Sequence, residues 1–295
     1  MITVMGATGQ TGGQIALALL AAGARVRALG RNERALTALR RHGAEVWRGD
    51  SADPTFLTGA FRDADAAYTL LPTDRRAPDY PRRQGEEGAA IATAIAASGV
   101  RHVVALSSLG AELPAGTGVI VGLHEQEQRL AALATAELLF LRPVSFFENF
   151  YDALAPIKAQ GSNADAVASD LAIPMIATRD IAAVAARALL ARDWQGRVVR
   201  ELLGQRDLTY REATQILGAR IGRPDLPYIQ LPYAEMAAAL VHGGLSASFA
   251  ERYVAMTHAF NTGLIRPGAG RTAENTTPTR FEDFADQLAH AYHAM

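Results

Sequence analysis

The stretch Ile2-Thr3-Val4-Met5-Gly6-Ala7-Thr8-Gly9-Gln10-Thr11-Gly12 decides the fold that this sequence predicts. Its first four residues form the apolar, β-branched run of a buried strand, and apolar side chains recur at helical spacing after Gly12. Three glycines lie between the strand and the helix. Gly6 allows a sharp turn, Gly9 allows the backbone to approach a ligand, and Gly12 allows the helix to pack closely against the strand.

A glycine turn between a strand and a helix is where many α/β proteins bind the diphosphate of a dinucleotide. The free N–H groups and the positive end of the helix dipole face the phosphates at such a turn. We therefore predict a dinucleotide site, with an ordinary structural turn as the alternative. The residues expected to contact the diphosphate are Gly6, Ala7, Thr8, Gly9, Gln10, Thr11 and Gly12.

The first half of the chain alternates short β-branched runs with amphipathic stretches. This alternation predicts an α/β fold with a doubly wound parallel sheet, the Rossmann fold, since each helix connects two parallel strands. The predicted strands cover residues 2–5, 25–29, 44–48, 66–71, 101–106 and 137–141, and the helices between them cover 11–22, 33–41, 85–97 and 123–134.

The alternation ends after Asn149, where prolines separate short helices from isolated strands. We expect Asp180 to cap a helix over 180–190, and Thr209 to cap a helix over 209–221 as part of a capping box with Glu212. The domains predicted from this change are an NAD(P)-binding Rossmann domain over 1–150, to which part of 177–203 returns as a strand over 198–203, and a smaller α+β lobe on the substrate side over 151–295.

The end of the second predicted strand indicates which dinucleotide is bound. An acidic residue about 20 residues after the glycine turn would bond the ribose 2′-hydroxyl of NAD, but this chain has Gly30-Arg31-Asn32 there. A guanidinium can pair with a 2′-phosphate through two parallel hydrogen bonds. The prediction is therefore NADP(H) rather than NAD(H), with a solvated surface arginine as the alternative. Further candidate contacts follow the later strands: Asp50, Ser51, Leu71, Pro72, Ser107, Ser108, Pro143, Phe146 and Asn149.

Composition excludes several classes of protein. With 29 basic and 30 acidic residues, the formal net charge is −1, which argues against a general nucleic-acid or membrane-surface binder. The chain has no cysteine, so disulfides, thiolate nucleophiles and cysteine-based metal sites are excluded, and we predict no metal site. No apolar run reaches the roughly 18 residues of a membrane span, and no signal peptide is evident. We expect a soluble, cytoplasmic protein.

Several segments together resemble the NmrA-like family of atypical short-chain dehydrogenases/reductases, which includes NADPH-dependent quinone reductases and NADP(H)-sensing regulators. The most specific is Leu141-Arg142-Pro143-x-x-Phe146-x-Glu148-Asn149. The glycine turn, Arg31, Leu71-Pro72, residues 176–182 and residues 276–279 resemble this family too. The resemblance implies contacts to NADP(H) from the turn, from Arg31 and from Leu71-Pro72, with residues 143–149 beside the nicotinamide.

The sequence departs from the usual catalytic groups of short-chain dehydrogenases, which pair a tyrosine with a lysine four residues later. The only lysine is Lys158, and Leu154 stands four residues before it. The lysine that isoflavone-reductase-like relatives carry after the fifth strand is also absent. His124 and Glu127, three residues apart on a predicted helix, are the candidate proton-donating pair, with a structural role as the alternative. Phe146 and Phe147 are candidates for the wall of an apolar pocket.

Two functions fit these residues. The first is a reductase that transfers hydride from NADPH to a quinone or a similar small planar acceptor, a reaction that needs little proton catalysis because the product oxygens are acidic. The second is a non-catalytic NADP(H)-sensing regulator that acts on a protein partner. The small-molecule substrate belongs to the first function, and a homo-oligomer is compatible with both.

Overall fold

A seven-stranded parallel sheet forms the centre of the structure, a computed structural model that describes residues 1–268 and 270–295. The strand order is β10-β6-β5-β4-β1-β2-β3, and every neighbouring pair is parallel. The doubly wound sheet is therefore confirmed, and its order reverses between β1 and β4, where ligands bind in such sheets. The strands are β1 (Ile2–Val4), β2 (Val26–Gly30), β3 (Glu45–Arg48), β4 (Ala66–Thr69), β5 (His102–Leu106), β6 (Glu137–Pro143) and β10 (Arg197–Leu202).

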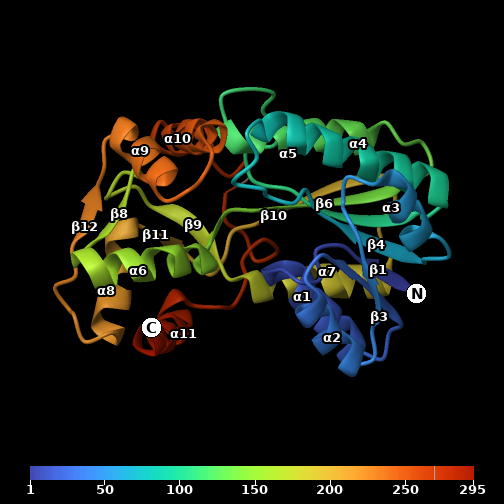
Figure 1. The fold of residues 1–295 in the computed structure, drawn as a ribbon, viewed down its shortest axis with the longest axis horizontal. Helices are drawn as coiled ribbons and strands as arrows, with labels where there is room; N and C mark the ends of the chain where they lie inside the picture. Colours follow the sequence, from blue (N-terminus) through green and yellow to red (C-terminus); the bar gives the residue numbers. More distant parts are fainter. Residues whose placement is uncertain (269) are drawn as a thin grey trace.

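Two layers of helices cover the sheet, one on each face (Figure 1). Apolar side chains of α1, such as Ile15 and Leu19, are fully buried against the strands, which is why the helical spacing in the sequence was informative. One face carries α1 (Gln10–Ala21), α2 (Glu33–Arg41) and α7 (Thr178–Ala191), and the other carries α3 (Pro54–Phe61), α4 (Tyr80–Ser98) and α5 (Val121–Ala131).

Helix α3 was not predicted from the sequence. It has only eight residues, Pro54–Phe61, so its apolar positions show no clear helical period. A local signal for it exists, because Asp53 accepts hydrogen bonds from the N–H groups of Thr55 and Phe56 and Pro54 occupies the first helical turn. An aspartate followed by proline is typical of a helix start.

The chain returns from its second half to the main sheet. Strand β10 lies parallel to β6, with Arg197 opposite Leu138 and Leu202 opposite Pro143. It covers nearly the residues predicted as a strand, 198–203. Helix α7 immediately precedes it and packs against α1, so the strand and this helix complete one edge and one layer of the larger unit.

The start of α7 corrects the prediction that Asp180 caps this helix. The helix begins at Thr178, and the Asp180 carboxylate instead accepts hydrogen bonds from the backbone N–H and the hydroxyl of Thr279. The carboxylate of Glu148 accepts from the backbone N–H and the hydroxyl of Thr178, and so performs the capping from a distant segment. The cap at Thr209 is confirmed, since its hydroxyl accepts from the N–H of Glu212 at 2.9 Å.

The remaining elements form a smaller lobe beside the sheet (Figure 1). Its core is a cluster of aromatic and aliphatic side chains that includes Phe147, Phe150, Phe281 and Phe284. Two small sheets, β11-β9-β7 and β12-β8, lie in this lobe. Its elements are β7 (Ser145–Phe146), α6 (Tyr151–Gln160), β8 (Asn163–Asp165), β9 (Ile173–Ile176), β11 (Asp207–Leu208), α8 (Tyr210–Arg220), β12 (Tyr228–Gln230), α9 (Tyr233–His242), α10 (Ala247–Asn261) and α11 (Phe281–Ala294).

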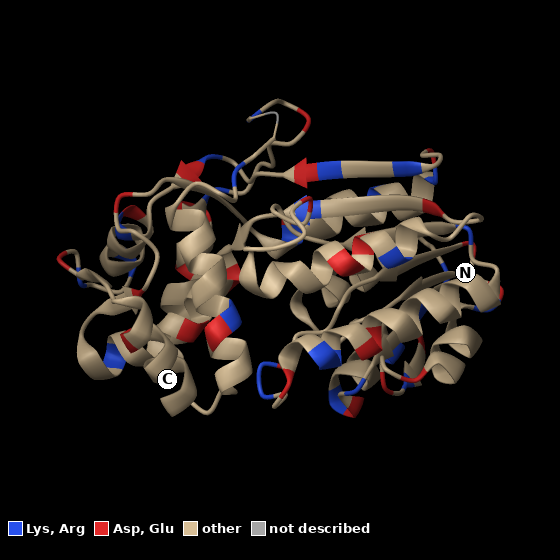
Figure 2. Cartoon of the chain, turned by 90° about the horizontal axis from the view of Figure 1, so that it is seen from above, with Lys and Arg blue, Asp and Glu red and all other residues tan. Residues whose placement is uncertain are grey.

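Acidic and basic residues are interspersed along the whole ribbon (Figure 2). This distribution agrees with a net charge of −1 and gives neither unit a single sign. Within residues 1–268 and 270–295, no helix has both the length and the apolar character needed to cross a membrane.

Candidate functional site

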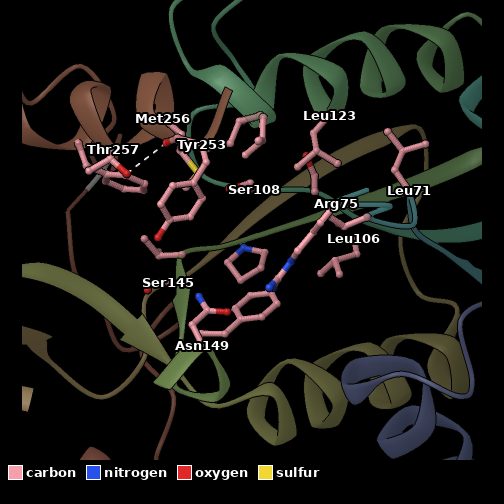
Figure 3. A pocket seen from close by; sticks show the side chains of 18 of the residues that line it. Leu71, Arg75, Leu106, Ser108, Leu123, Ser145, Asn149, Tyr253, Met256 and Thr257 are labelled. Atoms are coloured by element: carbon pink, nitrogen blue, oxygen red, sulfur yellow. Dashed lines mark hydrogen bonds between the residues drawn. The ribbon is translucent and has the colours of Figure 1, made fainter. Parts of the chain in front are cut away.

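A cavity of about 360 Å³ lies at the carboxyl ends of the main strands, between the sheet and the smaller lobe (Figure 3). Its walls come from the segments that follow β1, β4, β5 and β6, and from α10 on the opposite side. Because the strand order reverses here, the cavity occupies the expected position for a dinucleotide and its reaction partner. The predicted cofactor-binding residues that line it are Gln10, Leu71, Ser107, Ser108, Pro143, Phe146 and Asn149.

The glycine turn leads into this cavity through Gln10 and has the close packing that its spacing predicts. Gly6 has a φ of 61°, a conformation that favours glycine. A Cβ at Gly12 would lie 2.4 Å from the carbonyl oxygen of Gly6 and 2.7 Å from that of Met5. Gly12 therefore lets α1 approach the end of β1.

The amino end of α1 is open to an anion. Its N-cap is Gly9, which offers no side-chain hydrogen bond, and the first turn has no acidic residue. Helices α2, α3 and α4 differ, because the side chains of Asn32, Asp53 and Asp79 accept hydrogen bonds from their first N–H groups. A Cβ at Gly9 would have one neighbour within 4 Å, the carbonyl oxygen of Gly6 at 3.3 Å, so it would point into otherwise open space. These residues fit the diphosphate of a dinucleotide.

Arg31 follows β2 and is exposed to solvent. No carboxylate of the described residues forms an ion pair with its guanidinium. The nearby Asp50 pairs with Arg83 at 3.0 Å, and the N–H of Ala52, with the charges of Arg83 and Arg31, lowers the pKa of Asp50. The ion pair of Asp50 is with Arg83 and not with Arg31, so the guanidinium of Arg31 stays available for a phosphate.

Several other predicted residues lie outside the lining of the cavity. The hydroxyl of Ser51 donates to the carboxylate of Glu87 at 3.1 Å, which ties the end of β3 to α4. Asp50 holds the same region, because it accepts a hydrogen bond from the N–H of Ala52 and pairs with Arg83 on α4. Their contacts to an adenine stay a prediction, and so does that of Pro72. Beside Gly6, Gly9 and Gly12, the turn residues outside the lining are Ala7, Thr8 and Thr11.

Glu127, one of the two candidate proton donors, is buried in an ion pair. Its carboxylate accepts two hydrogen bonds from the guanidinium of Arg142, at 2.9 and 2.6 Å, and one from the hydroxyl of Ser107 at 2.5 Å. The ring of His124 is bonded through Nδ1 to the carbonyl oxygen of Ala111 at 2.8 Å. Neither side chain lines the cavity. These contacts give both residues a structural role, and their proton donation stays a prediction.

The segment Pro143–Asn149 is held from two sides by charged side chains of the family-like motif. Arg142 fixes the end of β6 to α5 through Glu127, and Glu148 fixes the following turn to α7 through Thr178. Burial raises the pKa of Glu148, although the hydrogen bonds from Thr178 oppose this shift. The result is a firmly held loop that presents Pro143, Phe146 and Asn149 to the cavity.

Phe147 does not contribute to the cavity wall, contrary to the sequence-based expectation. Its ring is 1% exposed and packs edge-on against Phe281, at 5.0 Å between ring centres. Phe146 alone of the pair lines the cavity. Phe146 ends β7, whereas Phe147 begins a 3₁₀ helix over Phe147–Phe150, so the two side chains do not share one wall.

A tyrosine from the smaller lobe adds a polar group that the sequence did not reveal. Tyr253 on α10 lines the cavity, and its hydroxyl donates to the carboxylate of Asp165 at 2.9 Å. Burial raises the pKa of Asp165, and burial with the adjacent Asp165 raises that of Tyr253. Tyr210, which also lines the cavity, lies with its hydroxyl 3.4 Å from that of Ser145. No spacing in the sequence relates these residues, because they come from four separate elements.

Comparisons with known proteins place the chain in a family. It matches the NmrA-like family over residues 1–285. A (4-alkanoyl-5-oxo-2,5-dihydrofuran-3-yl)methyl phosphate reductase of Streptomyces griseus is 31% identical over 298 aligned residues, which cover 99% of each chain. An NAD(P)H azoreductase of Xenophilus azovorans is 27% identical over 253 residues, covering 85% of this chain and 84% of that protein.

The fold has close counterparts among solved structures. An NADPH-dependent quinone oxidoreductase of Escherichia coli, crystallised with NADPH, superposes with a TM-score of 0.82 at 24% identity, over 98% of this chain and 99% of that one. At that identity the likeness shows a shared fold. The family match over residues 1–285 and the identity with the Streptomyces reductase go further: this chain belongs to the NmrA-like family.

Proposed function

We propose that this protein binds NADP(H) at the glycine turn and transfers hydride from NADPH to a small planar acceptor, such as a quinone, in the cavity. The observation that carries the proposal is the continuity of the site. The lining of the cavity includes Gln10, the first residue at the open end of α1, and reaches Tyr253 in the other lobe. The reductase names of two relatives support the reaction class.

The chain would bind the cofactor through groups that the structure leaves available. The first N–H groups of α1 would hold the diphosphate, and Arg31 would pair with a 2′-phosphate, which favours NADP(H) over NAD(H). Ser108 and Asn149 would provide polar contacts at the nicotinamide end, where both line the cavity. NADPH supplies the hydride when bound, while the chain positions the two reactants and excludes water.

The reduced acceptor needs a proton in addition to the hydride, and Tyr253 is the hydroxyl that we assign to this position. Burial raises the pKa of Asp165, so its carboxyl keeps its proton up to a higher pH than a solvent-exposed aspartate does. A neutral Asp165 can donate to the oxygen of Tyr253, which leaves the tyrosine O–H to bond the acceptor oxygen. Quinone, hydride and proton then give the hydroquinone. His124 and Glu127 are the alternative donors, but neither side chain lines the cavity, so a proton from them would have to pass through another group.

A specific observation favours a second candidate, a regulator that binds NADP(H) without catalysis and acts on a protein partner. The only lysine, Lys158, lies on α6 with its ammonium 5.6 Å from the centre of the Tyr292 ring. It does not line the cavity, so no tyrosine–lysine pair can serve the reaction there.

A two-stage experiment separates the candidates. NADPH and NADH are first titrated against the protein by fluorescence, and NADPH oxidation is then followed with a series of naphthoquinones. The reductase proposal expects tighter binding of NADPH and steady oxidation with at least one quinone. Tight binding without turnover, together with a co-purifying protein, would favour the regulator. No binding of either nucleotide would refute both.

A further inference from the structure

Arg75 is the one charged side chain among the described residues that line the cavity. The other lining residues are apolar or carry neutral polar groups, such as Gln10, Ser108 and Asn149. Figure 3 shows the Arg75 side chain extending into the cavity from the segment after β4. A cation that reaches into a mostly apolar cavity can hold an anionic group of a ligand there through charge-assisted hydrogen bonds, which are stronger than neutral ones.

The backbone around Arg75 is held in place by the other lobe. Its carbonyl oxygen accepts a hydrogen bond from the N–H of Ser246 at 3.0 Å, just before α10. The N–H of Tyr80, at the start of α4, donates to the hydroxyl of Ser248 at 3.1 Å. These two bonds fix the segment that bears Arg75 against α10, so the arginine is presented by an ordered backbone.

The guanidinium of Arg75 can donate further hydrogen bonds to a ligand. One terminal nitrogen donates to Asp152 at 2.7 Å, but the side chains of this pair are 45% and 68% exposed. Exposed pairs of this kind are worth only about 0–1 kcal/mol. The other nitrogens of Arg75 have no acceptor among the described residues, and the guanidinium lies 6.0 Å from the ring centre of Phe249. A ligand anion can therefore bind without the loss of a strong internal bond.

We infer that the physiological acceptor carries an anionic group, a carboxylate, sulfonate or phosphate, which Arg75 binds while the ring system lies against the apolar wall. This inference rests on the proposed reductase function and adds the substrate class. Leu106, Phe146 and Phe249 line the same cavity and supply apolar surface for a planar ring. Asp152 competes with the substrate anion for the guanidinium and so weakens its binding.

The test compares a naphthoquinone sulfonate with the same naphthoquinone lacking the sulfonate. A charge-assisted hydrogen bond contributes about 1.5–3 kcal/mol, so the Arg75→Gln variant should lower the ratio of kcat/KM for the sulfonate to that for the neutral quinone by about 10-fold or more. Arg76→Gln is the matched control, since Arg76 is the adjacent exposed arginine and does not line the cavity. It should leave the ratio unchanged. Asp152→Asn should raise the ratio, because it removes the competing carboxylate.

An unchanged ratio in Arg75→Gln, or an equal fall in Arg76→Gln, would overturn the inference. An equal fall in kcat/KM for both quinones, accompanied by weaker binding of NADPH to Arg75→Gln, would also overturn it, because Arg75 would then bind the cofactor. Binding of non-reducible naphthalene sulfonate and naphthol to the protein with NADP⁺ gives a readout without turnover. If Arg75→Gln loses binding of the sulfonate but keeps binding of the naphthol, the anion site is supported. Absence of quinone reduction would refute the reductase function alone.

Discussion

Two glycines of the turn, Gly9 and Gly12, should respond differently to substitution by alanine. Gly12→Ala should lower the stability of the fold, and Gly9→Ala should weaken the binding of NADPH. At Gly12, the new Cβ would lie 2.4 Å and 2.6 Å from the carbonyl oxygen and carbon of Gly6 and 2.7 Å from the oxygen of Met5. All three are backbone atoms, so the helix or the turn must shift. At Gly9, φ is −100° and ψ is −178°, an extended conformation that alanine adopts readily. The nearest atom is 3.3 Å away.

The magnitudes follow from these contacts. Overpacking of this kind costs about 1–3 kcal/mol, and the better helix propensity of alanine returns at most about 1 kcal/mol. Gly12→Ala should therefore lower the free energy of unfolding by about 1–2 kcal/mol, with a Tm lower by about 2–4 °C for each kcal/mol. Gly9→Ala should cost less than about 1 kcal/mol in stability. Its methyl group would occupy the approach of the diphosphate and weaken NADPH binding by at least about 10-fold, or 1.4 kcal/mol.

Thermal unfolding and fluorescence titration of both variants provide the assay. A diphosphate site at Gly9 is refuted if Gly9→Ala binds NADPH as tightly as the unmodified chain. Close packing of α1 at Gly12 is refuted if Gly12→Ala keeps the original Tm. Gly9→Ala is measured by NADPH binding and Gly12→Ala by thermal unfolding, so the two results test the two claims independently.

Three further variants test other parts of the site. Arg31→Ala should weaken NADPH far more than NADH, whereas Arg40→Ala, at the other end of α2, should change neither affinity; equal losses for both nucleotides would contradict a phosphate contact. Tyr253→Phe should lower kcat for quinone reduction by about 10-fold, the worth of one hydrogen bond, with NADPH affinity intact, and Tyr228→Phe is the control because its hydroxyl bonds backbone carbonyls instead. Asp165 has its pKa raised above 3.8 by burial, so the folded chain holds more protons than the unfolded chain above about pH 4, and stability falls as pH rises through that window. Denaturant unfolding of Asp165→Asn should show stability relative to the unmodified chain increasing from about pH 4 to pH 7; a constant difference would show that this carboxyl does not titrate abnormally.

The glycine turn, where we propose that the nucleotide binds, could be predicted from the sequence, since it depends on local order. Strand, glycine turn and helix are contiguous from Ile2 to Ala21, and the packing role of Gly12 needs only the atoms of Met5 and Gly6. The same holds for Thr209, whose cap lies three residues from its partner Glu212.

The proposed acceptor half could not be predicted in this way, because it is assembled from distant segments. Tyr253 bonds Asp165 across 88 residues. The carboxylate that caps α7 belongs to Glu148, 30 residues before it, while the local candidate Asp180 bonds Thr279 instead. Motifs of closely spaced residues cannot predict contacts between residues this far apart in the sequence.

A crystal structure of the protein with NADP⁺ tests the central claim most directly. We predict the diphosphate at the first N–H groups of α1, the 2′-phosphate on Arg31, and the nicotinamide ring in the cavity near Asn149. NADP⁺ bound elsewhere, or an α1 end that stays free of phosphate at saturating NADP⁺, would contradict it.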